Sequence, residues 1–326
     1  METQLVCMVE QIKSLRLAFG GDRVFLPVMG VITFFLSVKL IPMVTDMMVN
    51  SAAGLAGKHL GRQYRTLVIN CSTNNPEVAM MLISLFVAVG AERYGGIGTP
   101  LGSNFANIYL IFLVALFWTL FRLFFRNKQS FDQLMQLIRT ERKLVAWHLI
   151  MSFVMFLLAY SAFALITQPP LPAFLAWKAK LQLLGAAALC AIGIAVYVWK
   201  DAGLRKSRPE LFEDIDEDDH VASWKSFAIG TVGLCICCFF MNVLFLAAKE
   251  LYGAALTGLL GGTIFYMLHF FVGALVTSLP EMNVAVSNYE RTTAPDLNTA
   301  LSSASASNMS NLAIAGVGCL IAILFF

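Results

Sequence analysis

The sequence predicts an all-α polytopic membrane protein with about eight transmembrane helices, arranged as two inverted three-helix repeats and two linking helices. The first indication is composition: 58% of the 326 residues are hydrophobic and 13% are charged, whereas a soluble domain carries about 25% charged residues. The second is a series of apolar runs of about 20 residues, the length that crosses a bilayer. The third is a polar motif that occurs twice inside these runs.

The polar motif combines a threonine, a proline and a glutamate with a serine and two asparagines on the next apolar run. Six residues of its first copy recur in its second copy, each 204 positions later and without a gap. They are Thr73, Pro76, Glu77, Ser103, Asn104 and Asn107 in the first copy, and Thr277, Pro280, Glu281, Ser307, Asn308 and Asn311 in the second. Identical polar residues at a single offset indicate a duplicated unit.

Eight apolar runs are long enough to cross a bilayer. They lie near residues 24–44, 67–89, 101–125, 144–166, 181–199, 226–248, 262–288 and 297–326. The first run coincides with the sixth when it is shifted by 204 positions, so each repeat should contain three spans. Because five spans precede the second repeat, it enters the membrane from the opposite side, as in many secondary transporters.

The chain therefore divides into five segments. They are an N-terminal tail at 1–23, a first repeat at 24–126, spans 4 and 5 with a cytoplasmic segment at 127–200, an acidic cytoplasmic loop at 201–225 and a second repeat at 226–326. The tail lacks the continuous apolar core of a cleavable signal. Its apolar residues fall near one helical face, which fits either an interfacial helix or a frayed tail.

Two segments outside the spans have a pattern of their own. Residues 127–142 have the pattern of a short amphipathic helix at the membrane surface. The acidic run between Glu210 and His220 fits a solvated connector, with a weak cation sensor as the alternative. It lacks the glycine and the ligand spacing of an EF-hand loop.

Lysine and arginine indicate the orientation, because they collect on the cytoplasmic side. Fifteen of the 23 fall on one side of the predicted membrane: Lys58, Arg62, Arg65, Arg122, Arg126, Lys128, Arg139, Arg142, Lys143, Lys200, Arg205, Lys206, Arg208, Lys225 and Arg291. We therefore expect a cell membrane protein, in the plasma or inner membrane, with both termini outside.

The strongest candidates for a functional site are Glu77 and Glu281, one in each copy of the motif. An ionised side chain near the bilayer centre costs about 2.5–3.5 kcal/mol on insertion scales, so such residues persist where they face a polar cavity. Pro76 and Pro280 have no backbone N–H and leave a carbonyl one turn earlier without its helical partner. A protonated structural glutamate and a plain proline kink are the alternatives for a single copy; the pairing argues against both.

Hydroxyl and amide oxygens lie close to each glutamate. Thr73 and Thr277 precede the glutamates by four residues and share their helical face. Ser103 and Ser307 have the same spacing to Asn107 and Asn311, with Asn104 and Asn308 beside them. The two copies together offer roughly six to eight oxygens and two negative charges, which matches the needs of Ca²⁺. Glu77 and Glu281 are the predicted metal ligands.

Other polar residues are less central. Cys235, Cys237 and Cys238 lack the spacing of a structural metal site, because a helix points them in different directions. His269 fits a packed, hydrogen-bonded histidine better than a proton carrier. The net charge of +3 and the absence of a basic run interleaved with aromatics exclude nucleic acid as a partner.

With these residues the chain resembles the calcium/cation antiporter superfamily, which includes the sodium/calcium exchangers. The two inverted repeats of that family carry a Gly-Thr-Ser-x-Pro-Glu motif and, on the next helix, a Gly-Ser-Asn-like motif. Residues 277–281 (Thr-Ser-Leu-Pro-Glu) match the first motif, and residues 102–104 (Gly-Ser-Asn) match the second. The resemblance implies that cations are bound by Glu77, Glu281, Thr73, Thr277, Ser278, Asn104 and Asn308.

The chain departs from that family at several positions. Val276 stands at the glycine position of the first motif, Ala306 stands where the first copy has Gly102, and eight spans are found instead of ten. Asn74 stands near Pro76 and Glu77, at a position where the family usually has a hydroxyl residue. In this it resembles the proton-coupled branch of the family, where an asparagine lies near the glutamate. Asn74 is therefore a further candidate ligand.

The resemblance implies an antiporter that exchanges Ca²⁺ for Na⁺ by alternating access. The alternatives are an H⁺-coupled Ca²⁺/cation exchanger, and a channel-like or non-transporting homologue of the same fold. An enzyme is not expected, since no Ser/His or paired-Asp arrangement suits catalysis. The expected partners are the lipid bilayer and small inorganic cations, with no cofactor besides the transported Ca²⁺, Na⁺ or H⁺. The sequence does not indicate an oligomeric state.

Overall fold

The computed structural model describes residues 2–59, 72–88, 90–167, 176–212, 222–260 and 264–326. Throughout these ranges the regular secondary structure is helical. The described residues include seven helices that are long and apolar enough to cross a membrane, and a shorter apolar helix, α5 (Asn75–Val87). The chain is therefore a multi-pass membrane protein by helix length and composition. The predicted second span begins outside the described residues and continues as α5.

The first half of the chain runs from α1 (Glu2–Ala18) to α8 (Lys128–Thr140). Between them follow α2 (Asp22–Phe35), the π-helical η1 (Leu36–Leu40), α3 (Ile41–His59), α5, the 3₁₀ segment η3 (Gly90–Ile97), α6 (Gly98–Tyr109), the π-helical η4 (Leu110–Ala115) and α7 (Leu116–Arg126).

The second half runs from α9 (Arg142–Thr167) to α15 (Ala294–Phe325). Between them follow α10 (Ala176–Ser207), the 3₁₀ turn η6 (Pro209–Phe212), α11 (Trp224–Leu260), α12 (Ile264–Met267), the π-helical η7 (Leu268–Gly273), α13 (Ala274–Thr277) and α14 (Leu279–Tyr289).

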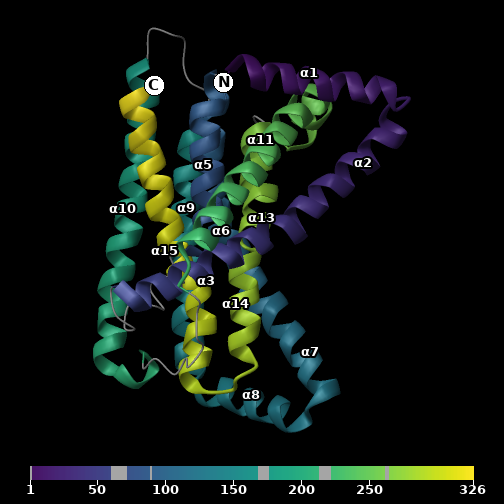
Figure 1. The fold of residues 1–326 in the computed structure, drawn as a ribbon. Coiled ribbons are helices and arrows are strands. Elements are labelled where there is room, and N and C mark those ends of the chain that lie inside the picture. Colours follow the sequence, from purple (N-terminus) through teal and green to yellow (C-terminus); the bar gives the residue numbers. More distant parts are fainter. Residues whose placement is uncertain (1, 60–71, 89, 168–175, 213–221, 261–263) are drawn as a thin grey trace.

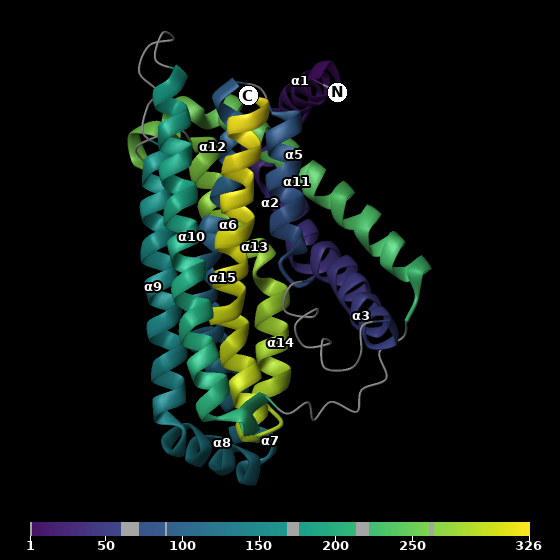
Figure 2. The same cartoon turned by 90° about the vertical axis from the view of Figure 1, so that its left-hand side faces the viewer.

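Helices that run roughly along the long axis of the molecule form its main bundle (Figure 2). Helix α15 packs against α5, α6, α9, α10 and α14, while α3 and α11 lie side by side at a slant to this bundle (Figure 2). Helix α1 lies across the end that holds both termini, and α8 lies across the opposite end together with the turn between α14 and α15 (Figure 1). The two copies of the polar motif are thereby brought to the same part of the bundle.

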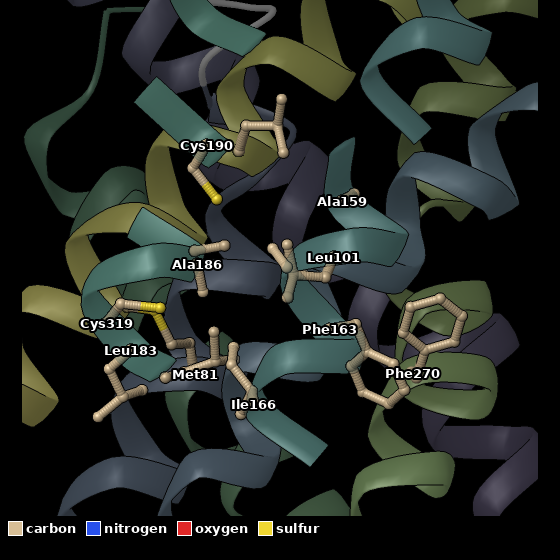
Figure 3. Close-up of a cluster of buried hydrophobic side chains, with 14 of the residues drawn as sticks. Met81, Leu101, Ala159, Phe163, Ile166, Leu183, Ala186, Cys190, Phe270 and Cys319 are labelled. Carbon is tan, nitrogen blue, oxygen red and sulfur yellow. The ribbon is translucent and has the colours of Figure 1, made fainter. Parts of the chain in front are cut away.

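A large apolar cluster fixes the helices around α15. Side chains from α5, α6, α9, α10, η7 and α15 meet in it (Figure 3). The rings of Phe163 and Phe270 lie 4.2 Å apart between centroids. Cys190 and Cys319 are buried there and fill space as small apolar side chains. Close packing of this kind is what holds helices together in a membrane, where lipid tails are as apolar as the side chains.

One contact sets the distance between the helices that carry the motif. At Gly102 on α6, a Cβ atom would lie 1.9 Å from the carbonyl oxygen of Phe270 on η7. The two backbones therefore meet directly, which only glycine allows. This contact places Ser103 and Asn104 on α6 beside the helix break that follows α13.

The segments outside the bundle are ordered by specific contacts. The N-terminal helix α1 packs Met8, Val9 and Ile12 against Val87 of α5 and Val243 of α11. The predicted amphipathic helix is α8, and the side chain of its N-cap residue Asn127 accepts a hydrogen bond from Ser130 N at 3.2 Å.

The acidic loop is described only at its two ends. Arg208 donates two hydrogen bonds to Glu141, at 3.1 and 3.2 Å, and pairs with Glu210. Donation from Arg208 lowers the pKa of the Glu210 carboxyl. Residues 213–221 of the predicted connector, which include most of its acidic residues, lie outside the described residues.

Candidate functional site

Each copy of the motif forms a break between two helices. Helix α5 begins at Asn75 with Pro76 in its first turn, and α14 begins at Leu279 with Pro280 in its first turn. Proline is compatible with the first turn of a helix, where its missing N–H has no acceptor to lose. The glutamate follows directly, so both carboxyl groups lie at the positive end of a helix dipole.

The two breaks have nearly the same backbone geometry. The N-cap residues are Asn74, with φ −86° and ψ 6°, and Ser278, with φ −87° and ψ 1°. In both copies the first helical hydrogen bond after the break has the same length, 3.3 Å from Val78 N to Asn74 O and from Met282 N to Ser278 O. The sequence match at these positions thus extends to local conformation.

The Glu77 carboxyl belongs to a cluster that includes hydroxyl groups from both copies. Ser103 Oγ donates to Glu77 Oε1 at 3.0 Å. Thr277, from the second copy, donates to Ala274 O at 3.3 Å. The Ser103 and Thr277 hydroxyl oxygens are 3.3 Å apart, so the three side chains form one cluster.

The Glu281 carboxyl has the corresponding set. Ser307 Oγ lies 3.4 Å from Glu281 Oε1 and 2.7 Å from Asn74 Oδ1. Thr73, from the first copy, is buried and directly precedes the Asn74 that Ser307 contacts. Each glutamate is thus contacted by the serine of its own copy, and each serine also contacts a residue of the other copy. Neither half of the chain therefore contains the full cluster.

All ten predicted site residues are buried, and each has at most 4% of its surface exposed. One oxygen of each carboxyl, Glu77 Oε2 and Glu281 Oε2, has no hydrogen-bond partner among the described residues. The same is true of Ser278 Oγ. The two carboxyl groups are close enough to interact electrostatically. Buried polar atoms are normally satisfied, so a shared proton or a cation would complete this arrangement.

The asparagines of the two copies are not used in the same way. Asn104 Nδ2 donates to Pro100 O of its own helix at 2.9 Å, and its Oδ1 is unpartnered within the described part of the chain. Asn308 Nδ2 donates across to Asn104 O on α6 at 3.1 Å and lies 3.4 Å from Ser152 O on α9. Asn104 therefore offers a free oxygen, whereas Asn308 connects helices.

Asn107 belongs to the repeated motif, but the sequence prediction did not include it among the cation-binding residues. Its Nδ2 donates to Ser307 Oγ and to Asn308 Oδ1, both at 3.0 Å, and so links α6 to α15. Its Oδ1, and both side-chain polar atoms of Asn311, are buried without a partner in the described structure. Asn107 follows Ser103 by four residues, and Asn311 follows Ser307 by four residues. This spacing was the sequence signal that could have placed both asparagines in the site.

Two buried histidines flank the site. His269 Nδ1 lies 2.8 Å from Thr99 Oγ1, which agrees with the predicted packed histidine. His148 on α9, which the sequence did not single out, lies 2.7 Å from Ser305 Oγ and 3.0 Å from Asn298 Oδ1, both on α15. Asn298 in turn donates to Leu211 O at 3.1 Å. His148 thus fastens the helix that carries Ser307 to α9 and η6.

The donor set determines which ions the site could hold. Within the described ranges, no three His, Cys, Asp or Glu side chains form a metal-binding group. The charged donors here are two carboxyls, supplemented by neutral hydroxyl and amide oxygens. Such a set suits a hard cation with weakly held oxygen ligands and does not suit a tightly bound structural metal.

Comparisons with protein-family models, curated proteins and solved structures found no match to this chain.

Proposed function

We propose that the chain is a secondary active antiporter that exchanges Ca²⁺ for Na⁺ across a membrane. The observation that carries the proposal is the pair of buried glutamates, each with a free oxygen and each contacted by the serine of its own copy, which in turn contacts the other copy. Buried carboxyl groups in a membrane protein are costly, and those that persist mark ion pathways by default.

In this proposal the two copies belong to inverted three-helix repeats. The 204-residue offset, the matching N-cap conformations and the contacts of Ser103 and Ser307 with the other copy support this arrangement. Inverted repeats bind substrate at discontinuous helices near the middle of the bilayer, and one bundle then moves against the other to open the site to alternate sides. The breaks before α5 and α14 provide two such discontinuous helices.

Charge balance limits what the site can carry. Two carboxylates neutralise one Ca²⁺, so the loaded site carries no net charge through the low-dielectric interior. Two Na⁺ or two H⁺ balance the same pair, whereas three Na⁺ leave an excess positive charge. Coupling to H⁺ is the second candidate, favoured by Asn74 beside Pro76 and by free carboxyl oxygens that could share protons. Both versions place the protein in the cell membrane with both termini outside.

The first prediction tests the glutamates by Ca²⁺ flux in proteoliposomes with an imposed Na⁺ gradient and then an imposed H⁺ gradient. Glu77→Gln and Glu281→Gln keep the shape of the site and remove one charge each. The loss should amount to several kcal/mol, and since 1.4 kcal/mol is tenfold, each variant should lose Ca²⁺ flux about a hundredfold or more. Glu10→Gln, at an exposed position on α1, is the control and should transport normally.

The outcomes separate the candidate functions. Flux driven by Na⁺ supports the main proposal, and flux driven only by H⁺ supports the second. Flux that does not saturate and needs no counter-ion would identify a channel. Near-normal Ca²⁺ flux in both Glu→Gln variants would contradict the proposed site and leave the glutamates as protonated structural residues.

A further inference from the structure

Two buried histidines contact the two helices that carry the serines of the site. His269 on η7 and His148 on α9 are each at most 1% exposed. His269 Nδ1 lies 2.8 Å from Thr99 Oγ1 on α6, and His148 Nδ1 lies 2.7 Å from Ser305 Oγ on α15. Each histidine thus contacts one hydroxyl through the same ring nitrogen, and the two hydroxyls lie on different helices of the site.

Each of these hydroxyls comes shortly before a serine that contacts a glutamate. Thr99 precedes Ser103 by four residues, so the two side chains share a face of α6. Ser305 precedes Ser307 by two residues on α15. The two serine hydroxyls lie 3.0 and 3.4 Å from the carboxyl oxygens of the glutamates. Because backbone hydrogen bonds make a helix stiff over one turn, a contact that fixes Thr99 or Ser305 also limits the movement of the serine that follows.

The contacts of His148 define which of its ring nitrogens carries the proton. Asn298 Nδ2 donates to Leu211 O at 3.1 Å, and a carbonyl oxygen can only accept. The amide oxygen of Asn298 therefore faces His148 Nε2, at 3.0 Å, and accepts a hydrogen bond from it. In the neutral ring Nδ1 has no proton, so it accepts the hydrogen bond that Ser305 Oγ donates. The imidazole is thereby held on both sides, and the Ser305 hydroxyl has a defined direction.

The ring of His269 is held by close packing. The rings of Phe245 and Phe265 lie 5.0 and 4.6 Å from it between centroids, in edge-to-face arrangements. A Cβ atom added at Gly98, the residue before Thr99, would lie 3.6 Å from His269 Cβ, so η7 and the start of α6 are in close contact here. A rotation of the imidazole away from Thr99 would displace these neighbours.

We propose that His269 and His148 are positioning residues of the cation site, one for each glutamate. His269 acts through Thr99 and His148 acts through Ser305, and each keeps the serine that follows within hydrogen-bonding reach of its glutamate. Helices in a membrane have no hydrophobic driving force between them, so polar contacts contribute directly to their alignment. The inference rests on the proposed cation site and does not require transport.

The experiment compares asparagine and glutamine at each histidine. Asparagine places its amide close to the position of Nδ1 and retains a partner for the hydroxyl, whereas glutamine places it close to Nε2 and loses that partner. The readout is the infrared bands of the two carboxyl groups in the purified full-length protein without Ca²⁺, because hydrogen bonds to a carboxyl group shift its band. Each band is assigned by its loss in Glu77→Gln or Glu281→Gln.

The expected shifts are specific to one glutamate. His269→Gln should shift the Glu77 band and leave the Glu281 band in place, and His148→Gln should do the reverse. The asparagine variants of both histidines should retain the wild-type bands. Unchanged bands in the two glutamine variants would overturn the inference. A shift of both bands in either of them would also overturn it, because a general loss of packing would act on both glutamates.

Calorimetric titration with Ca²⁺ adds a second test through double-mutant cycles. His148→Gln and Ser307→Ala should be coupled about threefold to tenfold in affinity, because both act on one carboxyl. His269→Gln and Ser103→Ala should be coupled to a similar extent. The crossed pairs should multiply within about twofold, and equal coupling in all four pairs would overturn the inference. Absence of Ca²⁺ binding in the wild-type protein would contradict the proposed function, while the infrared bands would still decide whether the histidines position the serines.

Discussion

At the scale of single residues, Asn104 and Asn308 occupy matching positions of the motif but have different surroundings. The amide of Asn308 bonds to the backbones of α6 and α9 and accepts from Asn107. The amide nitrogen of Asn104 bonds within α6, and its oxygen is free in the described structure. A shared position in a repeat therefore does not give the two side chains one role.

The second prediction uses these two residues as controls for each other. Asn308→Ala removes hydrogen bonds between helices, each worth about 1 kcal/mol, and should lower the thermal unfolding temperature in detergent. Asn104→Ala should leave that temperature nearly unchanged but reduce the rise that Ca²⁺ produces, because a neutral ligand is lost. Equal unfolding temperatures of the two variants without Ca²⁺ would contradict the difference inferred from their contacts.

The sequence predicted which residues form the site better than it predicted which side chains they contact. The repeat alone was enough to predict that Glu77 and Glu281 belong to one site, because a glutamate next to a proline is easily recognised inside an apolar run. The role of Asn107 across the helix interface, and the link from His148 to Ser305, depend on contacts between residues more than 150 positions apart. Spacing along one helix cannot reveal such contacts.

At the scale of helices, proline and glycine determine where the elements break and where they touch. The sequence predicted a freed carbonyl before each proline within a continuous span, whereas the structure has a helix break before α5 and before α14. The π-helical segments η1, η4 and η7 were not predicted, because a single extra residue in a turn leaves no clear hydropathy signal. The first span was predicted to end at residue 44, whereas α3 continues to His59.

The third prediction concerns the backbone contact at Gly102. In Gly102→Ala the new Cβ would lie 1.9 Å from Phe270 O, so η7 must move away from α6. Overpacking of this kind costs about 1–3 kcal/mol, and the shift should separate Ser103 from Thr277. We expect a lower unfolding temperature and reduced Ca²⁺ flux.

Gly30→Ala is the matched control for this change. Nothing lies within 4 Å of a Cβ added at Gly30, and alanine favours a helix over glycine. Its unfolding temperature should be equal to or slightly above that of the wild-type protein. Normal stability and flux in Gly102→Ala would show that η7 moves aside without cost.

At the scale of the whole molecule, the arrangement of the two ends bears on orientation. Both termini and α1 lie at one end, and α8 lies at the other (Figure 1). The excess of lysine and arginine predicts that the α8 end is cytoplasmic. The native Cys7 is exposed on α1, so each end offers a position for labelling.

The fourth prediction is that an impermeant thiol reagent applied to intact cells labels Cys7. Cysteines introduced by Ser130→Cys on α8, or by Asp216→Cys in the acidic loop, should react only after permeabilisation. Both are examined in a Cys7→Ser background, which should itself show no labelling from outside. Labelling of Ser130→Cys from outside would reverse the orientation, and opposite sides for the two introduced cysteines would contradict the predicted number of spans.

The reciprocal contacts between the two copies also matter during synthesis of the chain. Thr277 follows Glu77 by 200 positions, and at about 5–20 residues per second this separation corresponds to roughly 10–40 s of translation. Throughout that interval Glu77 has the Ser103 hydroxyl of its own copy, but the Thr277 hydroxyl that contacts Ser103 is still missing. Helix α5, with 13 described residues, is about 20 Å long and does not by itself span the roughly 30 Å hydrocarbon layer. A nascent chain that stalls before α15 therefore carries both carboxyls in an unfinished site, because Ser307, which contacts Glu281, lies on α15.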